Sequence, residues 1–215
     1  LVGSEMCIRD RPLTEQPEYN GTQLIHSKVI ASYLRQLLRN DLQYAPFRME
    51  GMEQDVREMM EIDTPQGKLA LQIGGTIDRL DSKGDTLRIV DYKTGGTPKT
   101  PENIEQLFTP ADNRPNYIFQ TFLYAAILCR KQSLKVAPSL LYIHRAASES
   151  YSPVIEMGAP RQPKVPVNNF AFFEDEFRER LHGLLQEIFS QEETFSQTED
   201  TRKCEYCDFR SLCKR

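Results

Sequence analysis

Residues 74–95 read Gly-Gly-Thr-Ile-Asp-Arg-Leu-Asp-Ser-Lys-Gly-Asp-Thr-Leu-Arg-Ile-Val-Asp-Tyr-Lys-Thr-Gly. This stretch predicts two β-strands, over residues 69–80 and 87–94, because both segments alternate and are rich in β-forming residues. Between them, Ser82–Asp85 supplies turn residues around Gly84. The stretch therefore predicts an antiparallel hairpin, and the rest of the chain is interpreted around it.

Two aspartates and a lysine lie on these strands. Residues two apart on a strand point to the same face, so Asp91 and Lys93 lie side by side, about 7 Å apart. With the turn centred on residues 83 and 84, Asp78 lies opposite Ile89 and shares that face. A turn one residue longer would direct Asp78 away. Paired carboxylates and an ammonium on one rigid sheet face indicate a divalent-metal site for phosphodiester hydrolysis.

These residues carry a resemblance to a known family. Residues 77–81 (Ile-Asp-Arg-Leu-Asp) followed by 89–95 (Ile-Val-Asp-Tyr-Lys-Thr-Gly) resemble the core of the PD-(D/E)XK nuclease superfamily, in particular the RecB/AddB-type nuclease domain. The stretch from Gln120 to Tyr124 resembles the Q-x-x-x-Y helix of that branch. The C-terminal cysteines resemble its iron–sulfur motif. Four pieces in the family order, spanning roughly residues 47–215, make a specific signal.

The resemblance implies an α/β fold with a restriction-endonuclease-like core, a mixed β-sheet flanked by helices, and a C-terminal cysteine-rich tail. It implies that Asp78, Asp91 and the backbone carbonyl of Tyr92 hold Mg²⁺ or Mn²⁺. Lys93 would help to deprotonate the attacking water or would stabilise the pentavalent state. A further pair, Gln120 and Tyr124, lies on one helical face, where Gln120 would hold a phosphate or a water and Tyr124 would support it. The alternative for Tyr124 is a core residue with a satisfied hydroxyl.

Two residues before the hairpin match the family pattern less closely. Glu53, on a strand predicted over residues 47–63, resembles the acid that precedes the core hairpin and is a tentative metal ligand. The alternative for Glu53 is a solvated charge at a sheet edge. His26 lies on a helix predicted over residues 23–44, but its spacing from Gly21 departs from the histidine motif of the family. We therefore interpret His26 as an ordinary helix residue.

Three cysteines crowd the C-terminus with metal-ligand spacing. Cys204, Cys207 and Cys213 suit three irons of a [4Fe–4S] cluster. In the family the fourth ligand comes from far upstream, and the remaining cysteines here are Cys7 and Cys129, the latter predicted to be buried in a helix. We therefore expect the fourth cluster ligand to be absent from this chain. A zinc site of three cysteines and a histidine is the alternative.

The first eleven residues, Leu-Val-Gly-Ser-Glu-Met-Cys-Ile-Arg-Asp-Arg, match the translation of a transposase adapter used in sequencing-library preparation. We expect a non-native leader over residues 1–11. Residues 12–215 then form a single nuclease-like domain whose N-terminal part is missing. A length of 215 residues suits one domain with a sizeable core.

Composition limits the class of protein. A hydrophobic content of 39% with 27% charged residues is ordinary for a soluble globular protein. The net charge of −4 argues against a broadly basic DNA-coating protein, but a nuclease needs acids for its metal site. No apolar run is long enough to span a bilayer and no secretory pattern occurs, so we expect a cytoplasmic protein with no membrane partner.

The function expected from the resemblance is a metal-dependent DNA nuclease in DNA repair or recombination, an exonuclease in preference to an endonuclease. No ATP-binding motif of the Gly-rich Lys-Ser/Thr type occurs in the chain, so a motor would lie in a helicase subunit or in an upstream helicase-like region. Two alternatives stay open. One is a catalytically inactive DNA-binding module of the same fold, and the other is a non-nuclease metal protein whose acids form a salt-bridged hairpin.

Overall fold

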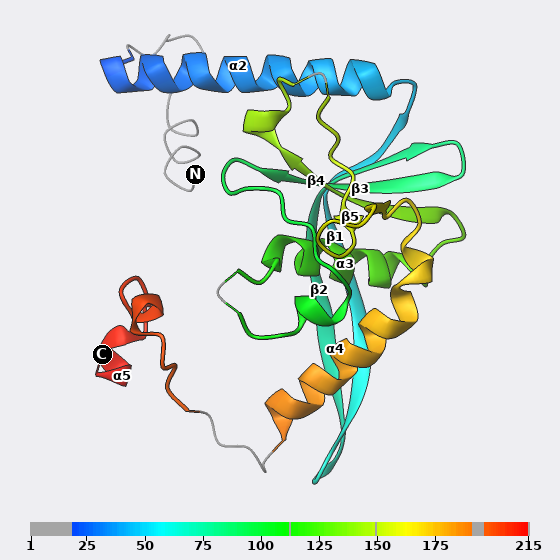
Figure 1. Cartoon of the computed structure of the whole chain (residues 1–215), viewed down its shortest axis with the longest axis vertical. Helices are drawn as coiled ribbons and strands as arrows, with labels where there is room; N and C mark the ends of the chain where they lie inside the picture. Colours follow the sequence, from blue (N-terminus) through cyan, green and yellow to red (C-terminus); the bar gives the residue numbers. More distant parts are fainter. Residues whose placement is uncertain (1–18, 112, 149, 191–195, 215) are drawn as a thin grey trace, which may run out of the picture.

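The computed structural model describes residues 19–111, 113–148, 150–190 and 196–214; the predicted leader over residues 1–11, with Cys7, lies outside them. A four-stranded sheet in the order β1-β2-β3-β4 forms the centre (Figure 1). Three antiparallel strands, β1 (Arg48–Thr64), β2 (Gly67–Lys83) and β3 (Thr86–Lys93), follow one another, and β4 (Lys135–Tyr142) runs parallel to β3. The mixed sheet implied by the resemblance is confirmed.

The turn between β2 and β3 sets which residues face each other. Lys83 pairs with Thr86, so the turn residues are Gly84 and Asp85, and Gly84 has a φ of 62°, a left-handed value that favours glycine. Continued by one step, this register places Asp78 opposite Asp91. The predicted register, with Asp78 opposite Ile89, was wrong by two residues. Because an even shift preserves the face, Asp78 still shares a face with Asp91 and Lys93.

The two core strands separate next to the aspartates. The last pair between β2 and β3 is Arg79 with Val90. Beyond it, β2 continues beside β1, where Ile77 pairs with Gln54, and β3 continues beside β4, where Asp91 pairs with Leu140. The sheet therefore opens between its two central strands, and polar side chains can enter the opening.

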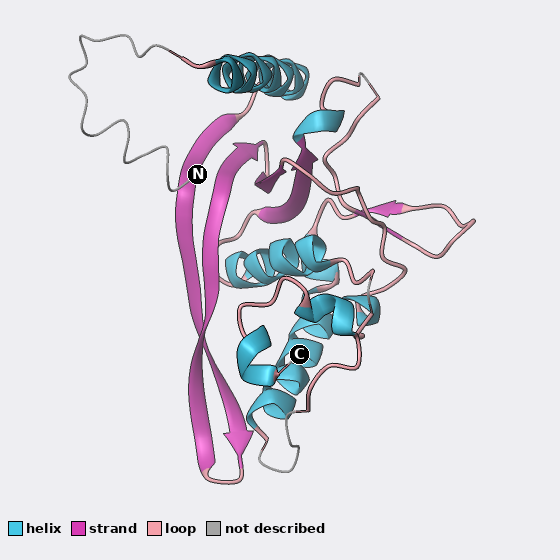
Figure 2. Cartoon of the chain, turned by 90° about the vertical axis from the view of Figure 1, so that its left-hand side faces the viewer, coloured by secondary structure: helices cyan, strands magenta, loops and turns pink. Residues whose placement is uncertain are grey.

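Two helices, α3 (Asn116–Cys129) and α4 (Glu174–Phe189), lie on the face of the sheet that carries Asp91. Figure 2 shows the long, twisted β1–β2 hairpin running past both helices. Helix α4 is fixed by Arg178, whose guanidinium bonds Glu58 of β1 at 2.8 Å and the Ala126 carbonyl of α3 at 2.6 Å. The core between these layers is aromatic and aliphatic, with Leu80, Ile89, Phe122, Phe170 and Phe177 among its buried residues.

The opposite face of the sheet carries α2 (Gly21–Tyr44), which confirms the helix predicted over residues 23–44. Only Tyr33 and Leu37 of its apolar residues pack on the small cluster that contains Val90 and Leu141. The remaining Leu, Ile and Val side chains of α2 are exposed: Leu24, Ile25, Val29, Ile30, Leu34, Leu38 and Leu42. In the part of the chain that the structure describes, no helix is both long and apolar enough to cross a membrane.

The remaining elements are short. They are η1 (Glu105–Leu107), η2 (Ile143–Arg145), the two-stranded sheet of β5 (Glu156–Met157) and β6 (Val165–Pro166), η3 (Phe170–Phe172), η4 (Thr201–Cys204) and α5 (Arg210–Cys213).

Residues 151–156 form no continuous strand: the ladder contacts of this segment are a bridge at Val154 and the start of β5. The Tyr151 side chain replaces the missing pairing. Its hydroxyl donates to the Leu140 carbonyl at 2.9 Å and accepts the Tyr142 N–H at 2.8 Å.

Candidate active site

The opening between β2 and β3 holds three of the predicted site residues. The Asp78 carboxylate accepts the backbone N–H of Tyr92 at 2.8 Å, so a side chain bridges the strands where their ladder has ended. On β3, the Lys93 ammonium lies 2.5 Å from Oδ2 of Asp91. Strand alternation places Asp91 and Lys93 on this face, and the register of the hairpin brings Asp78 opposite them.

Asp91 is the most constrained of the three. Its side chain is buried, with 3% of the residue exposed. Burial raises the pKa of Asp91, the neighbouring Lys93 lowers it, and the charge of Asp78 raises it again, leaving it above the ordinary value. Oδ2 of Asp91 makes no hydrogen bond of regular geometry, and its contact is the Lys93 ammonium. A buried carboxylate with a second carboxylate nearby attracts a cation.

Helix α3 completes the surroundings of Lys93. The ammonium lies 3.4 Å from the side-chain oxygen of Gln120 and 4.3 Å from the centre of the Tyr117 ring. The side-chain amide of Gln120 then donates to the Tyr124 hydroxyl at 3.0 Å. The structure thus joins Lys93, Gln120 and Tyr124 in one chain of contacts, with Tyr124 itself buried in the core.

A glycine on β2 makes room for this chain of contacts. A Cβ added to Gly75 would lie 2.7 Å from the Tyr124 hydroxyl oxygen and 3.0 Å from a ring carbon. Such contacts are too short for real side chains, so Gly75 lets the Tyr124 ring pack directly on the β2 backbone. Tyr124 is therefore a core residue and a support for Gln120 at once.

The back of the site rests on a buried ionic cluster on the other face of the sheet. Arg79 bonds the Tyr92 hydroxyl at 3.0 Å, Asp81 at 2.9 Å and Asp41 of α2 at 2.8 Å. Asp81 also accepts two bonds from Arg88, at 2.9 and 2.7 Å. Because Tyr92 bonds Asp78 through its backbone and Arg79 through its side chain, this cluster positions the site from behind.

Two of these residues were missed by sequence reasoning. Tyr117 has no motif of its own, and its contact with Lys93 depends on how α3 meets β3. Arg79 gave a usable signal: it lies two residues from Asp81, so the two side chains share a face and can pair.

A family model described as the PD-(D/E)XK nuclease superfamily matches residues 5–214. The chain belongs to this superfamily. Its mixed α/β architecture, with a four-stranded sheet flanked by helices, is a restriction-endonuclease-like fold. No curated protein matches the chain.

The donor set of this PD-(D/E)XK site is small. Among the residues that the structure describes, no group of three or more His, Cys, Asp or Glu side chains can hold a metal ion. Asp78 and Asp91 are the carboxylates predicted to hold the metal, and the Tyr92 carbonyl is the predicted third ligand. These hard oxygen donors, with the buried Asp91 oxygen whose contact is the Lys93 ammonium, fit a divalent cation such as Mg²⁺.

Glu53 lies in β1 between residues that pair with both neighbours of Asp78, which places it opposite that aspartate. Its φ of 48° departs from strand geometry, and its side chain is exposed. Its role as a metal ligand stays a prediction. His26 is exposed on α2, in keeping with an ordinary helix residue.

The tail cysteines are free thiols. Cys204 and Cys213 are half-buried and Cys207 is exposed, and the three do not form a metal-holding group within the described residues. Cys129 lies half-buried in α3, where burial, followed by the charge of Glu174, raises the pKa of its thiol to about 11. The cluster ligands therefore stay a prediction.

Proposed function

We propose that this chain is a metal-dependent DNA nuclease that hydrolyses phosphodiester bonds at the opening between β2 and β3. The observation that carries the proposal is the buried carboxylate of Asp91, which lies between the charge of Asp78 and the ammonium of Lys93. Membership of the PD-(D/E)XK nuclease superfamily supports the same reaction class.

Asp78, Asp91 and the Tyr92 carbonyl are the residues proposed to hold Mg²⁺ or Mn²⁺. When bound, such an ion lowers the pKa of a water ligand and neutralises charge on the phosphate. The Tyr92 N–H holds one oxygen of Asp78 in place, which leaves its other oxygen for the cation. This bond preorganises Asp78 for the cation, whereas at Asp91 the cation replaces the contact with the Lys93 ammonium.

Lys93 is proposed to stabilise the negative charge that develops on the phosphate. Its neighbours are the Asp91 carboxylate, the Gln120 amide oxygen and the face of Tyr117, and each of them attracts a cation. Gln120 is proposed to orient Lys93 and a phosphate oxygen, and Tyr124 fixes the Gln120 amide. All three residues would act by positioning groups and by their charge or dipole, which are the effects that phosphodiester hydrolysis needs from a protein.

One observation favours a second candidate. The short contact between Lys93 and Asp91 would also occur in a salt-bridged hairpin without catalytic function. However, both side chains are largely buried, with 15% of Lys93 and 5% of Asp91 exposed. A buried ion pair by itself adds little to the free energy of unfolding, because both charges lose their hydration. The pair is better explained by a site in which a divalent cation shares Asp91 with Lys93. A catalytically inactive DNA-binding module is disfavoured because both aspartates and the lysine are present.

The wider assignments belong to the same proposal. The chain would act in the cytoplasm on DNA ends, as an exonuclease in repair or recombination, beside a helicase subunit or helicase-like region. Cys204, Cys207 and Cys213 would hold a [4Fe–4S] cluster with a ligand from outside this chain. Support for these points comes from the RecB/AddB-type motifs in the sequence.

The test is Mg²⁺-dependent cutting of linear and circular DNA, single-stranded and double-stranded. Wild type is compared with Asp91→Ala and Lys93→Ala, and with Asp63→Ala as an exposed acid of β1. We expect cutting by wild type and Asp63→Ala, loss of cutting in EDTA, and a loss of about 100- to 1,000-fold for each site variant. Cutting that survives both site changes would reject the proposal, and a preference for linear over circular DNA would support an exonuclease.

A further inference from the structure

A pocket of about 310 Å³ opens beside the candidate active site. It lies between the loop that follows β3 and the first turn of α3, with Tyr142 at the end of β4 as a wall. Its lining includes Gly96, Lys99, Arg114, Asn116, Tyr117 and Tyr142. The superfamily motifs include none of these residues, so the nuclease assignment leaves the pocket unexplained.

The pocket adjoins the site through the Tyr117 ring. The Tyr117 ring that carries the Lys93 ammonium on its face also lines the pocket. On the other side, Tyr142 pairs with Lys93 in the parallel register of β3 and β4. Gly96, three residues after Lys93, has a φ of 79°, and a Cβ there would lie 3.3 Å from the Tyr117 ring. A ligand in the pocket would therefore sit next to a phosphate bound beside Lys93.

The pocket is cationic although the chain as a whole is acidic. It contains Lys99 and Arg114 and no Asp or Glu, whereas the whole chain has a net charge of −4. The Lys99 ammonium bonds the carbonyl oxygens of Asn113 and Arg114, at 2.8 and 3.3 Å, which fixes its charge at the rim. Arg114 donates from Nε to Asn116 at 2.8 Å, and its two Nη groups are the donors suited to phosphate oxygens.

The pocket also offers an aromatic surface. Tyr117 is 43% exposed, so part of its ring is open to a ligand. An exposed aromatic ring beside fixed positive charges is the combination with which proteins hold single-stranded nucleic acid, because each base has a π-face that can stack. A double helix keeps its bases stacked on each other, so such a pocket suits an unpaired nucleotide.

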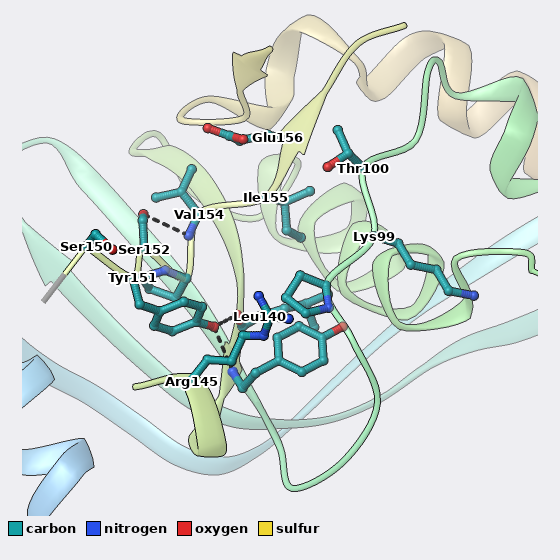
Figure 3. A pocket seen from close by; sticks show the side chains of 13 residues that line it. Lys99, Thr100, Leu140, Arg145, Ser150, Tyr151, Ser152, Val154, Ile155 and Glu156 are labelled. Carbon is teal, nitrogen blue, oxygen red and sulfur yellow. Dashed lines mark hydrogen bonds between the residues drawn. The ribbon is translucent and has the colours of Figure 1, made fainter. Parts of the chain in front are cut away.

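A neighbouring pocket of about 280 Å³ extends the basic surface (Figure 3). It shares Lys99 and Tyr142 with the first pocket and adds the exposed Arg145, with Glu156 at its far side. In Figure 3 the Lys99 side chain extends away from Tyr151 and Arg145. Lys99 thus lines both pockets, and Arg145 adds a positive charge beyond the first pocket.

We propose that the pocket formed by Tyr117, Arg114 and Gly96 binds one unpaired nucleotide of a DNA strand, adjacent to the phosphate that is cut. Tyr117 stacks on the base, and Arg114 and Lys99 hold the flanking phosphates. This proposal rests on the proposed function, and it makes single-stranded DNA, or an unpaired end, the substrate bound at this site.

Binding of a fluorescein-labelled oligothymidylate tests the pocket, measured by anisotropy in EDTA so that the probe stays intact. The variants are Tyr117→Ala and Tyr117→Phe, with Tyr19→Ala as matched control, since Tyr19 is 53% exposed and lines neither pocket. We expect Tyr117→Ala to weaken binding by about 5- to 150-fold, which corresponds to about 1–3 kcal/mol per stacked base. Tyr117→Phe and Tyr19→Ala should bind within about twofold of wild type, because both keep the stacking ring.

Two further measurements sharpen the test. A blunt duplex should bind equally to wild type and Tyr117→Ala. Arg114→Ala should reduce the slope of log affinity against log salt by about 0.7, the value for one phosphate contact on a single strand. Circular dichroism of each variant checks that the fold is kept.

The proposal is overturned if wild type does not bind the oligothymidylate, or if Tyr117→Ala binds it like wild type. It is also overturned if Tyr117→Phe loses as much affinity as Tyr117→Ala, or if Tyr117→Ala loses as much affinity for the blunt duplex as for the oligothymidylate. Cutting of the same probe by wild type in Mg²⁺ is measured in parallel. Cutting with no Tyr117 effect on binding would reject the pocket alone. A Tyr117 effect without cutting would reject the nuclease proposal and leave a nucleotide-binding pocket.

Discussion

The Asp78 carboxylate and the Tyr92 backbone N–H meet at 2.8 Å where β2 and β3 separate. This bond replaces a ladder bond between the strands, and it fixes a carboxylate of the proposed metal site. Tyr92 is held in turn by Arg79, whose guanidinium bonds its hydroxyl at 3.0 Å on the opposite face of the sheet. The position of the acid therefore depends on a buried cluster that substrate does not touch.

Gly75→Ala should disturb the site through Tyr124. The new Cβ would meet the Tyr124 hydroxyl oxygen at 2.7 Å, so the ring must move and the Gln120 amide loses its partner. We expect a loss of stability of about 1–3 kcal/mol by urea unfolding, with a fall in the DNA cutting rate. Gly95→Ala is the control, because its Cβ meets no atom within 4 Å. Equal effects of the two changes would refute the packing explanation.

Asp81→Ala should be among the most destabilising single changes in the sheet. Asp81 is fully buried and accepts bonds from Arg79 and Arg88, so its removal leaves two buried guanidinium groups without this partner. We expect a loss of about 3–5 kcal/mol in the free energy of unfolding. Glu61→Ala, which breaks an exposed pair with Lys68 at 3.5 Å, should cost about 0–1 kcal/mol. A loss for Asp81→Ala no larger than for Glu61→Ala would contradict the buried cluster.

The pH dependence of stability should report on Asp91 in metal-free protein. Burial, partly offset by Lys93, raises the pKa of Asp91 above its ordinary value of 3.8, so the folded state binds this proton more readily than the unfolded state. The proton on Asp91 therefore stabilises the folded state. This stabilisation is fully present below pH 3.8 and is lost as pH rises through the pKa of Asp91 in the folded state.

Asp91→Asn removes the carboxyl group, and with it the loss of stability that follows deprotonation of Asp91. In urea unfolding with EDTA, we expect the stability of Asp91→Asn relative to wild type to increase as pH rises from about 4 to about 7. A difference that does not change with pH would show that the Asp91 carboxylate is not perturbed in the folded protein.

Thiol reactivity should separate the tail cysteines from Cys129. With a pKa of about 11 instead of the ordinary 9.0, Cys129 has, at about pH 7.5, roughly 100-fold less thiolate than an ordinary cysteine. In iron-free protein we expect alkylation at Cys204, Cys207 and Cys213 before Cys129, measured by mass spectrometry.

Supplying iron, sulfide and a small thiol as the fourth ligand under anaerobic conditions should protect the three tail cysteines and give visible absorbance that is lost in Cys207→Ser. Protection by zinc alone, without colour, would favour the zinc alternative. Equal reactivity with and without metal would argue against any site in the tail.

The strands and their shared face followed from local patterns. Alternation predicts which side chains point the same way, and Gly84 marks the turn because the left-handed region favours glycine. The register was not predictable, since the residues around Gly84 fit turns at 83–84 and at 84–85 equally well. The prediction of a shared face survived because the two registers differ by two residues.

Contacts between distant elements were beyond local patterns. Tyr117 reaches Lys93 only because α3 crosses the face of β3, and Gly75 matters only because Tyr124 packs above it. The φ of 48° at Glu53, in turn, depends on how β1 accommodates β2 near Asp78. Such features come from tertiary packing, which leaves no local pattern in a single sequence.

Titration of the metal-free protein with Mn²⁺ tests most directly whether Asp78 and Asp91 together hold a divalent ion. Wild type and the exposed-acid control Asp63→Asn should bind Mn²⁺ equally. Lys93→Ala should bind it at least as tightly, because the competing ammonium 2.5 Å from Asp91 is gone, although we expect this variant to lose DNA cutting. Asp78→Asn and Asp91→Asn should each weaken binding by at least about 10-fold. Wild-type affinity in both aspartate variants would contradict the proposed site.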